Sequence, residues 1–166
     1  MSLTLAAVGA VLAALLELTI VPYLRVGGAQ PDLVLVFAVV WTMVVGFEGG
    51  LAWAFVGGLT TDLLGTSPLG VTSFTLLVSV GAASLINRFV TRARYLSPIF
   101  VVFILSLLTS LLGYALYGAL RGPVSAPDPL GLALPGAVYD MALTALIGPL
   151  AVALHTRYGE PERIDW

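Results

Sequence analysis

Three carboxylic acids fall inside long apolar stretches of this sequence, and they are the first candidates for chemistry. Glu17, Asp62 and Asp140 are each surrounded by mostly apolar residues. An ionisable side chain at membrane depth is costly, so such residues are functional candidates by default. Two membrane carboxylates could form an aspartyl protease, in which one carboxylate activates water and the other supplies a proton.

Each acid also has a structural interpretation. Glu17 lies late in the first apolar run, where it could reach the polar membrane interface or contact a partner or ligand. Asp62 could hydrogen-bond the backbone of the turn that follows it, through Thr66 and Ser67. Asp140 lies near the start of the last predicted helix, where the helix dipole favours a carboxylate. The sequence leaves both alternatives open for each acid.

Residues that other catalytic classes require are missing from the sequence. There is no cysteine and one histidine, His155, which argues against thiolate chemistry and a recognisable metal site. Neither a Gly-x-Ser-Gly nor a Gly-x-Gly-Asp signature accompanies the acids, and no glycine-rich phosphate loop is present. We therefore expect that the protein is not an enzyme and that it has no catalytic residue, cofactor or metal ion. A net charge of −2 without a dense basic cluster argues against nucleic acid as a partner.

Composition places these acids in a membrane protein. Hydrophobic residues make up 59% of the 166 residues, charged residues 10%, and the mean hydropathy is +1.04. Each crossing needs about 20 apolar residues in helical form, because hydrocarbon offers no water to the backbone. The sequence predicts an all-α, polytopic integral membrane protein with a single transmembrane domain over residues 1–166. Six transmembrane helices are predicted, over residues 3–24, 32–46, 50–64, 69–87, 97–120 and 135–155.

The second and third predicted helices are short, and residues 32–64 could cross the bilayer twice or form a re-entrant hairpin. Orientation follows from the arginines, because short cytoplasmic loops retain positive charge. Arg88, Arg92 and Arg94 share one loop, which we expect in the cytoplasm. With six crossings, both termini are then cytoplasmic.

Small residues follow one face of the first predicted helix. Ala6, Ala10 and Ala14 recur at every fourth position, with Leu3 and Ala7 nearby. Such a flat stripe permits close approach of another helix. That helix could belong to the same chain, or the stripe could be a docking face for another membrane protein.

Three stretches of the sequence carry an ordered set of motifs. These are a Pro-Asp pair opening a helix, a glycine-rich short connection, and Gly-Leu-x-x-Asp running into Pro-Leu-Gly. The stretches are Gln30-Pro31-Asp32-Leu33, Gly46-Phe47 to Gly50, and Gly57-Gly58-Leu59-Thr60-Thr61-Asp62-Leu63-Leu64-Gly65-Thr66-Ser67-Pro68-Leu69-Gly70. The chain thereby resembles MreD, the family of rod shape-determining membrane proteins, most strongly over residues 30–87.

This resemblance implies a non-enzymatic scaffold in the bacterial cytoplasmic membrane, within the machinery that inserts peptidoglycan along the side wall. The implied direct partner is MreC, and the larger complex would include MreB, RodA and its penicillin-binding transpeptidase. In such a family Asp62, Pro68, Leu69 and Gly70 form a typical external loop, which Asp62 would brace.

The family is also similar to the six-helix substrate-binding subunits of energy-coupling-factor vitamin transporters. Those subunits dock their partner through small residues on the first helix, a role that would suit Ala6, Ala10 and Ala14. A transporter subunit is therefore the alternative function, with its ligand beneath the external loops near Glu17, Asp62 or Asp140. An ion-coupled channel would need ionisable residues strung across the bilayer, whereas here they gather near one side.

Overall fold

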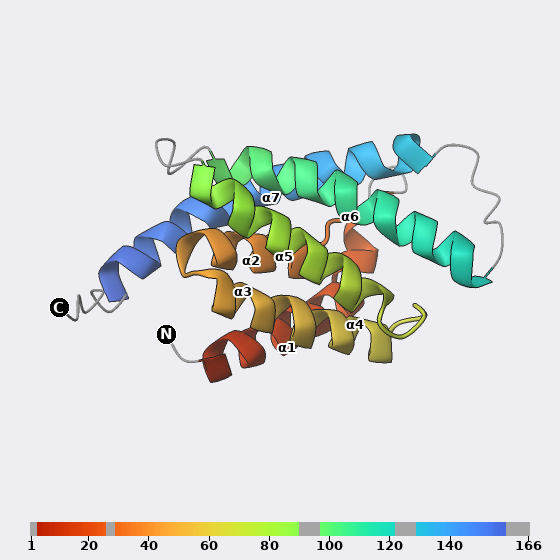
Figure 1. The fold of residues 1–166 in the computed structure, drawn as a ribbon, viewed down its shortest axis with the longest axis horizontal. Helices are drawn as coiled ribbons and strands as arrows, with labels where there is room; N and C mark the ends of the chain where they lie inside the picture. Colours follow the sequence, from red (N-terminus) through yellow and green to blue (C-terminus); the bar gives the residue numbers. More distant parts are fainter. Residues whose placement is uncertain (1–2, 26–28, 90–96, 122–128, 159–166) are drawn as a thin grey trace.

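The computed structural model describes residues 3–25, 29–89, 97–121 and 129–158, and the regular elements in these ranges are helices (Figure 1). In Figure 1, α6 and α7 form an upper layer and α1 lies at the bottom, with α2 and α5 between them. In chain order the elements are α1 Leu3–Thr19, the 3-10 turn η1 Val21–Leu24, α2 Leu33–Val44, α3 Phe47–Ala52, the π-helical turn η2 Trp53–Gly57, α4 Gly58–Leu64, α5 Val71–Phe89, α6 Ser97–Arg121 and α7 Pro129–Tyr158.

Three of these helices are long and apolar enough to cross a membrane: Val71–Phe89, Pro98–Leu120 and Pro129–Ala151. α1 and α2 are shorter apolar helices. α3, η2 and α4 follow one another without a break, so residues 47–64 form one helical rod. The chain is an all-α membrane protein, as its composition predicts.

The hairpin of residues 32–64 packs one of its arms, the rod of residues 47–64, along α5. Its turn is at Gly46, whose φ of +132° is a conformation that favours glycine. Asn87, near the end of α5, donates from Nδ2 to the carbonyl of Met43 at 3.5 Å, so this turn lies beside the C-terminal end of α5. At the opposite end, Asp62 bonds the start of α5. The rod of residues 47–64 therefore extends from one end of α5 to the other, whereas α2 is shorter. Two crossings of the bilayer by residues 32–64 stay a prediction.

Glycines let the rod of residues 47–64 approach helices on two sides. A Cβ added at Gly57 would lie 2.6 Å from Cγ1 of Val34 and 3.6 Å from Cβ of Ala10. A Cβ added at Gly58 would lie 2.6 Å from Cα of Ser73 on α5. The two adjacent glycines therefore face α1 and α2 on one side and α5 on the other, which is the close packing that small residues permit in membranes.

The alanine stripe of α1 packs inside the chain. Ala6, Ala10 and Ala14 are at most 1% exposed, and α1 contacts α2 and the whole rod of residues 47–64. The interpretation of these three residues as a docking face for a partner is therefore wrong, because the stripe is already filled by helices of the same chain. Leu3 is 57% exposed and Ala7 is half-buried, so these two remain accessible.

The last helix begins earlier than predicted. α7 starts at Pro129 instead of Pro135, and both Pro135 and Pro149 lie inside it. Prolines are tolerated within transmembrane helices, because neighbouring helices and side chains satisfy the freed backbone groups. Asp140 consequently lies well inside a helix of 30 residues, so its interpretation as a helix-dipole partner of α7 is wrong. The third predicted helix likewise starts three residues earlier, at Phe47.

Candidate functional site

The site is formed where α2 begins inside the bundle. α2 has 12 residues, a length of about 18 Å at 1.5 Å per residue, whereas the hydrocarbon core is about 30 Å thick. The first N–H groups of a helix have no partner within the helix. Where the bundle shields such groups from water, other protein groups must accept these hydrogen bonds.

Three carboxyl groups accept them. Asp140 Oδ1 accepts from the backbone N–H of Asp32 at 2.7 Å, and Glu17 Oε2 accepts from that of Val34 at 2.9 Å. Asp32, the N-cap residue, accepts from the N–H of Leu35 at 2.8 Å. The positive end of the helix dipole adds a favourable interaction with negative charge at this position. Acids from α1, α7 and α2 itself thus jointly cap α2.

Asp140 also joins α6 to this arrangement. Ser106 Oγ of α6 donates to Asp140 Oδ2 at 2.6 Å. Both carboxylate oxygens of Asp140 are therefore used, and through them α2, α6 and α7 are held together. Asp140 is 1% exposed and Ser106 is 3% exposed. A hydrogen bond in such a buried setting is electrostatically stronger than the same bond in water.

A polar pocket of about 330 Å³ opens beside the three acids. The carboxyl groups of Glu17 and Asp32 lie within hydrogen-bonding reach of each other at its wall. At the exposed rim, Arg25 Nε donates to Gln30 Oε1 at 2.8 Å. This volume is at the lower end of the range for small-molecule sites. The lining residues are Glu17, Arg25, Ala29, Gln30, Pro31, Asp32, Ser106, Ser110, Gly136 and Asp140.

Asp62 has a separate role at the α4–α5 connection. Its Oδ2 accepts from the N–H of Gly70 at 3.0 Å and from both N and Oγ of Ser73 at 3.2 Å, while Oδ1 accepts from the N–H of Thr72 at 3.1 Å. These bonds reach further along the chain than the predicted ones to Thr66 and Ser67. Asp62 thus braces the turn and caps α5.

The structure separates Asp62 from Asp140, the two aspartates considered for an aspartyl protease. Asp140 caps α2 and lines the polar pocket, whereas Asp62 caps α5 and is not part of that pocket's lining. Within the described ranges, no group of three or more His, Cys, Asp or Glu side chains could hold a metal ion. The carboxyl groups of Glu17, Asp32, Asp62 and Asp140 accept hydrogen bonds from backbone N–H and hydroxyl groups. These bonds hold the helices of the bundle together.

Residues 2–123 match the family model described as rod shape-determining protein MreD. The chain belongs to this family. Its role is accordingly in rod shape determination, as a membrane protein. Comparison with curated proteins found no match, and comparison with solved structures found none either. Glu17, Asp32 and Asp62 lie inside the matched stretch, and Asp140 lies beyond it.

The family motifs have clear structural positions. In the Pro-Asp pair, Asp32 caps α2 and bonds Asp140 through its backbone. In the Pro-Leu-Gly loop, Gly70 has a φ of +90° and donates its N–H to Asp62. Leu69 is 69% exposed. The sequence marks Asp32 only as a helix opening and not as a site residue, although its place directly after Pro31 at a helix start indicates an N-cap.

Replacing Asp62 with alanine should destabilise the start of α5. Four hydrogen bonds lose their acceptor, and loss of a helix cap costs about 0.5–2 kcal/mol. We expect a lower unfolding temperature in mild detergent, measured by intrinsic tryptophan fluorescence. Thr60→Ala is the matched control, because Thr60 lies on α4 like Asp62, but its side chain bonds only the carbonyl of Val56 in the same rod of residues 47–64. Equal stability of the two variants would show that Asp62 does not brace this turn.

Proposed function

We propose that the chain is a non-enzymatic scaffold of the bacterial cell-elongation complex, which binds MreC and supports side-wall peptidoglycan synthesis. The family match over residues 2–123 carries this proposal. The buried acids support it, because their bonds cross-link helices and leave a rigid bundle on which other membrane proteins can assemble. MreB, RodA and its penicillin-binding transpeptidase would be further members of the complex. The chain would lie in the cytoplasmic membrane with both termini in the cytoplasm.

The outer face of α1 is our proposed contact surface for the transmembrane helix of MreC. Leu5, Val8 and Leu12 are 56%, 61% and 56% exposed, while the alanines on the opposite side of α1 are buried. Leu3 and Ala7 lie at the accessible N-terminal end of the same helix. Helix association in lipid depends on such side-chain packing, because lipid supplies no hydrophobic driving force.

Co-expression with tagged MreC tests the proposal. We expect a defined complex after purification in mild detergent, visible by native mass spectrometry without a bound molecule of vitamin size. Leu12→Trp should reduce the MreC recovered by about tenfold, equivalent to about 1.4 kcal/mol. Leu146→Trp is the control, because Leu146 is a 76% exposed leucine on α7, away from α1. Failure to recover MreC with the unaltered chain would contradict the proposal.

The polar pocket favours a second candidate, the substrate-binding subunit of a vitamin or small-molecule transporter. Its wall brings together Glu17 and Asp140, two of the acids predicted as ligand contacts, and adds Asp32. A fold like that of energy-coupling-factor subunits remains a prediction. In the same native mass spectrometry experiment, a lone chain carrying one small molecule would support this candidate and exclude the scaffold.

A further inference from the structure

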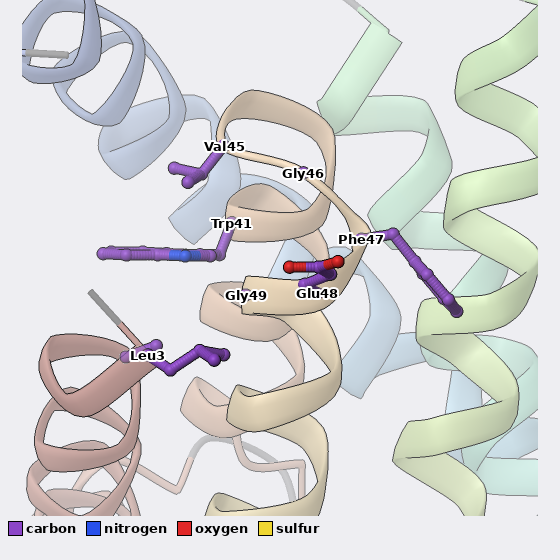
Figure 2. A pocket seen from close by; sticks show the side chains of 8 residues that line it. Leu3, Trp41, Val45, Gly46, Phe47, Glu48 and Gly49 are labelled. Atoms are coloured by element: carbon purple, nitrogen blue, oxygen red, sulfur yellow. The ribbon is translucent and has the colours of Figure 1, made fainter. Parts of the chain in front are cut away.

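A second pocket, of about 300 Å³, lies at the end of the bundle opposite Asp62. It surrounds the start of α3, next to the Gly46 turn that packs beside the end of α5. Figure 2 shows Trp41, Glu48 and Leu3 gathered there, with Gly49 beneath the Trp41 ring and Phe47 pointing away. The lining residues are Leu3, Ala6, Trp41, Val45, Gly46, Phe47, Glu48 and Gly49.

The two polar side chains of this pocket, Glu48 and Trp41, have no hydrogen-bond partner among the described residues. Glu48 is exposed, and no ion pair or hydrogen bond joins it to another described side chain. The half-buried Trp41 ring lies against Gly49, and no described group accepts a hydrogen bond from its Nε1. The pocket therefore offers one anionic acceptor and one neutral donor, beside the apolar side chains of Leu3, Ala6 and Val45.

Its place in the fold restricts what can occupy it. The long, apolar α5 ends near this pocket, and the exposed Arg88 lies in the last turn of that helix. A charged residue and a tryptophan at the end of a transmembrane helix mark the level of the lipid head groups. The volume suits a head group, and the apolar wall suits the glycerol and first acyl carbons below it.

We propose that this pocket binds the head group of a phospholipid with a primary ammonium, such as phosphatidylethanolamine. The ammonium carries three N–H donors for the Glu48 carboxylate, and the phosphate oxygens accept from Trp41 Nε1. Phosphatidylcholine has the same phosphate but no N–H donor, and phosphatidylglycerol has no cation. Both lipids therefore lack the hydrogen-bonded ion pair with Glu48.

Native mass spectrometry of the purified full chain tests this proposal. The chain is incubated with equal amounts of phosphatidylethanolamine, phosphatidylcholine and phosphatidylglycerol that carry the same acyl chains. We expect phosphatidylethanolamine to be retained about tenfold over phosphatidylcholine, the effect of one hydrogen bond to a charged group. Equal retention of these two lipids by the unaltered chain would overturn the proposal.

Three variants sharpen the test. Glu48→Gln should bring the retention ratio close to one, and Glu48→Lys should shift the preference to phosphatidylglycerol. Arg88→Gln is the matched control, because it removes an exposed charge at the same end of the bundle but outside the pocket lining, and it should keep the original preference. A Glu48→Gln chain that still prefers phosphatidylethanolamine would overturn the assignment to Glu48.

Discussion

Replacing Gly58 with alanine should destabilise the bundle, because the added methyl group would meet the backbone of the neighbouring helix α5. The added Cβ would lie 2.6 Å from Cα and 2.8 Å from N of Ser73. These are backbone atoms of α5, and the N–H of Ser73 is already held by Asp62 at 3.2 Å. α5 therefore cannot shift away without weakening the cap at its own start. Overpacking of this kind costs about 1–3 kcal/mol.

Two other glycines provide a control, because their replacement by alanine should not lower the stability. Gly81 on α5 and Gly113 on α6 have nothing within 4 Å of an added Cβ. Alanine at either position should leave stability unchanged or raise it, since alanine is favoured over glycine in a helix by about 1 kcal/mol. Unfolding temperatures of the three variants in the same detergent make the comparison. If Gly58→Ala were as stable as Gly81→Ala, the close contact between α4 and α5 would be wrong.

The apolar runs predicted the helices well, because the bilayer imposes both their length and their helical form. Their ends were harder to predict. Pro129 and Pro135 are both acceptable in the first turns of a helix, and only packing against α6 shows that α7 begins at the first of them. The spacing of Ala6, Ala10 and Ala14 predicted a contact face correctly, but spacing does not reveal which helix fills it.

The site itself could be predicted only in parts. A charge within an apolar run marks Glu17 and Asp140 in the sequence, whereas the Pro-Asp pair at Asp32 indicates only a helix opening. Their meeting depends on a bond between Asp32 and Asp140, which lie 108 positions apart. No local pattern encodes such a contact. The reason for it is visible only in three dimensions: α2 begins inside the bundle, and its first N–H groups need acceptors from other helices.

Loss of Asp140 should destabilise the fold strongly, because its carboxyl group joins three helices. Asp140→Ala removes the acceptor of the Asp32 N–H and of the Ser106 hydroxyl in one step. The Ser106 hydroxyl is buried, and the Asp32 N–H is partly buried. A buried donor left without a partner costs about 1–3 kcal/mol, so the free energy of unfolding should fall by about 2–5 kcal/mol. Urea or detergent titration followed by tryptophan fluorescence measures this change.

Two further variants serve as controls. Asp140→Asn separates the loss of hydrogen bonds from the loss of the carboxyl group, and Ser110→Ala measures the effect of a change elsewhere in the pocket wall. Asp140→Asn keeps a carbonyl oxygen for the Asp32 N–H, and its amide can donate to Ser106 Oγ, which can turn to accept. We expect it to retain most of the stability that Asp140→Ala loses. Ser110→Ala changes an exposed wall residue of the same pocket and should stay within about 0.5 kcal/mol of the unaltered chain. An Asp140→Ala chain as stable as Ser110→Ala would show that the start of α2 finds its acceptors elsewhere, and that the carboxyl groups are then free to hold a ligand instead of the fold.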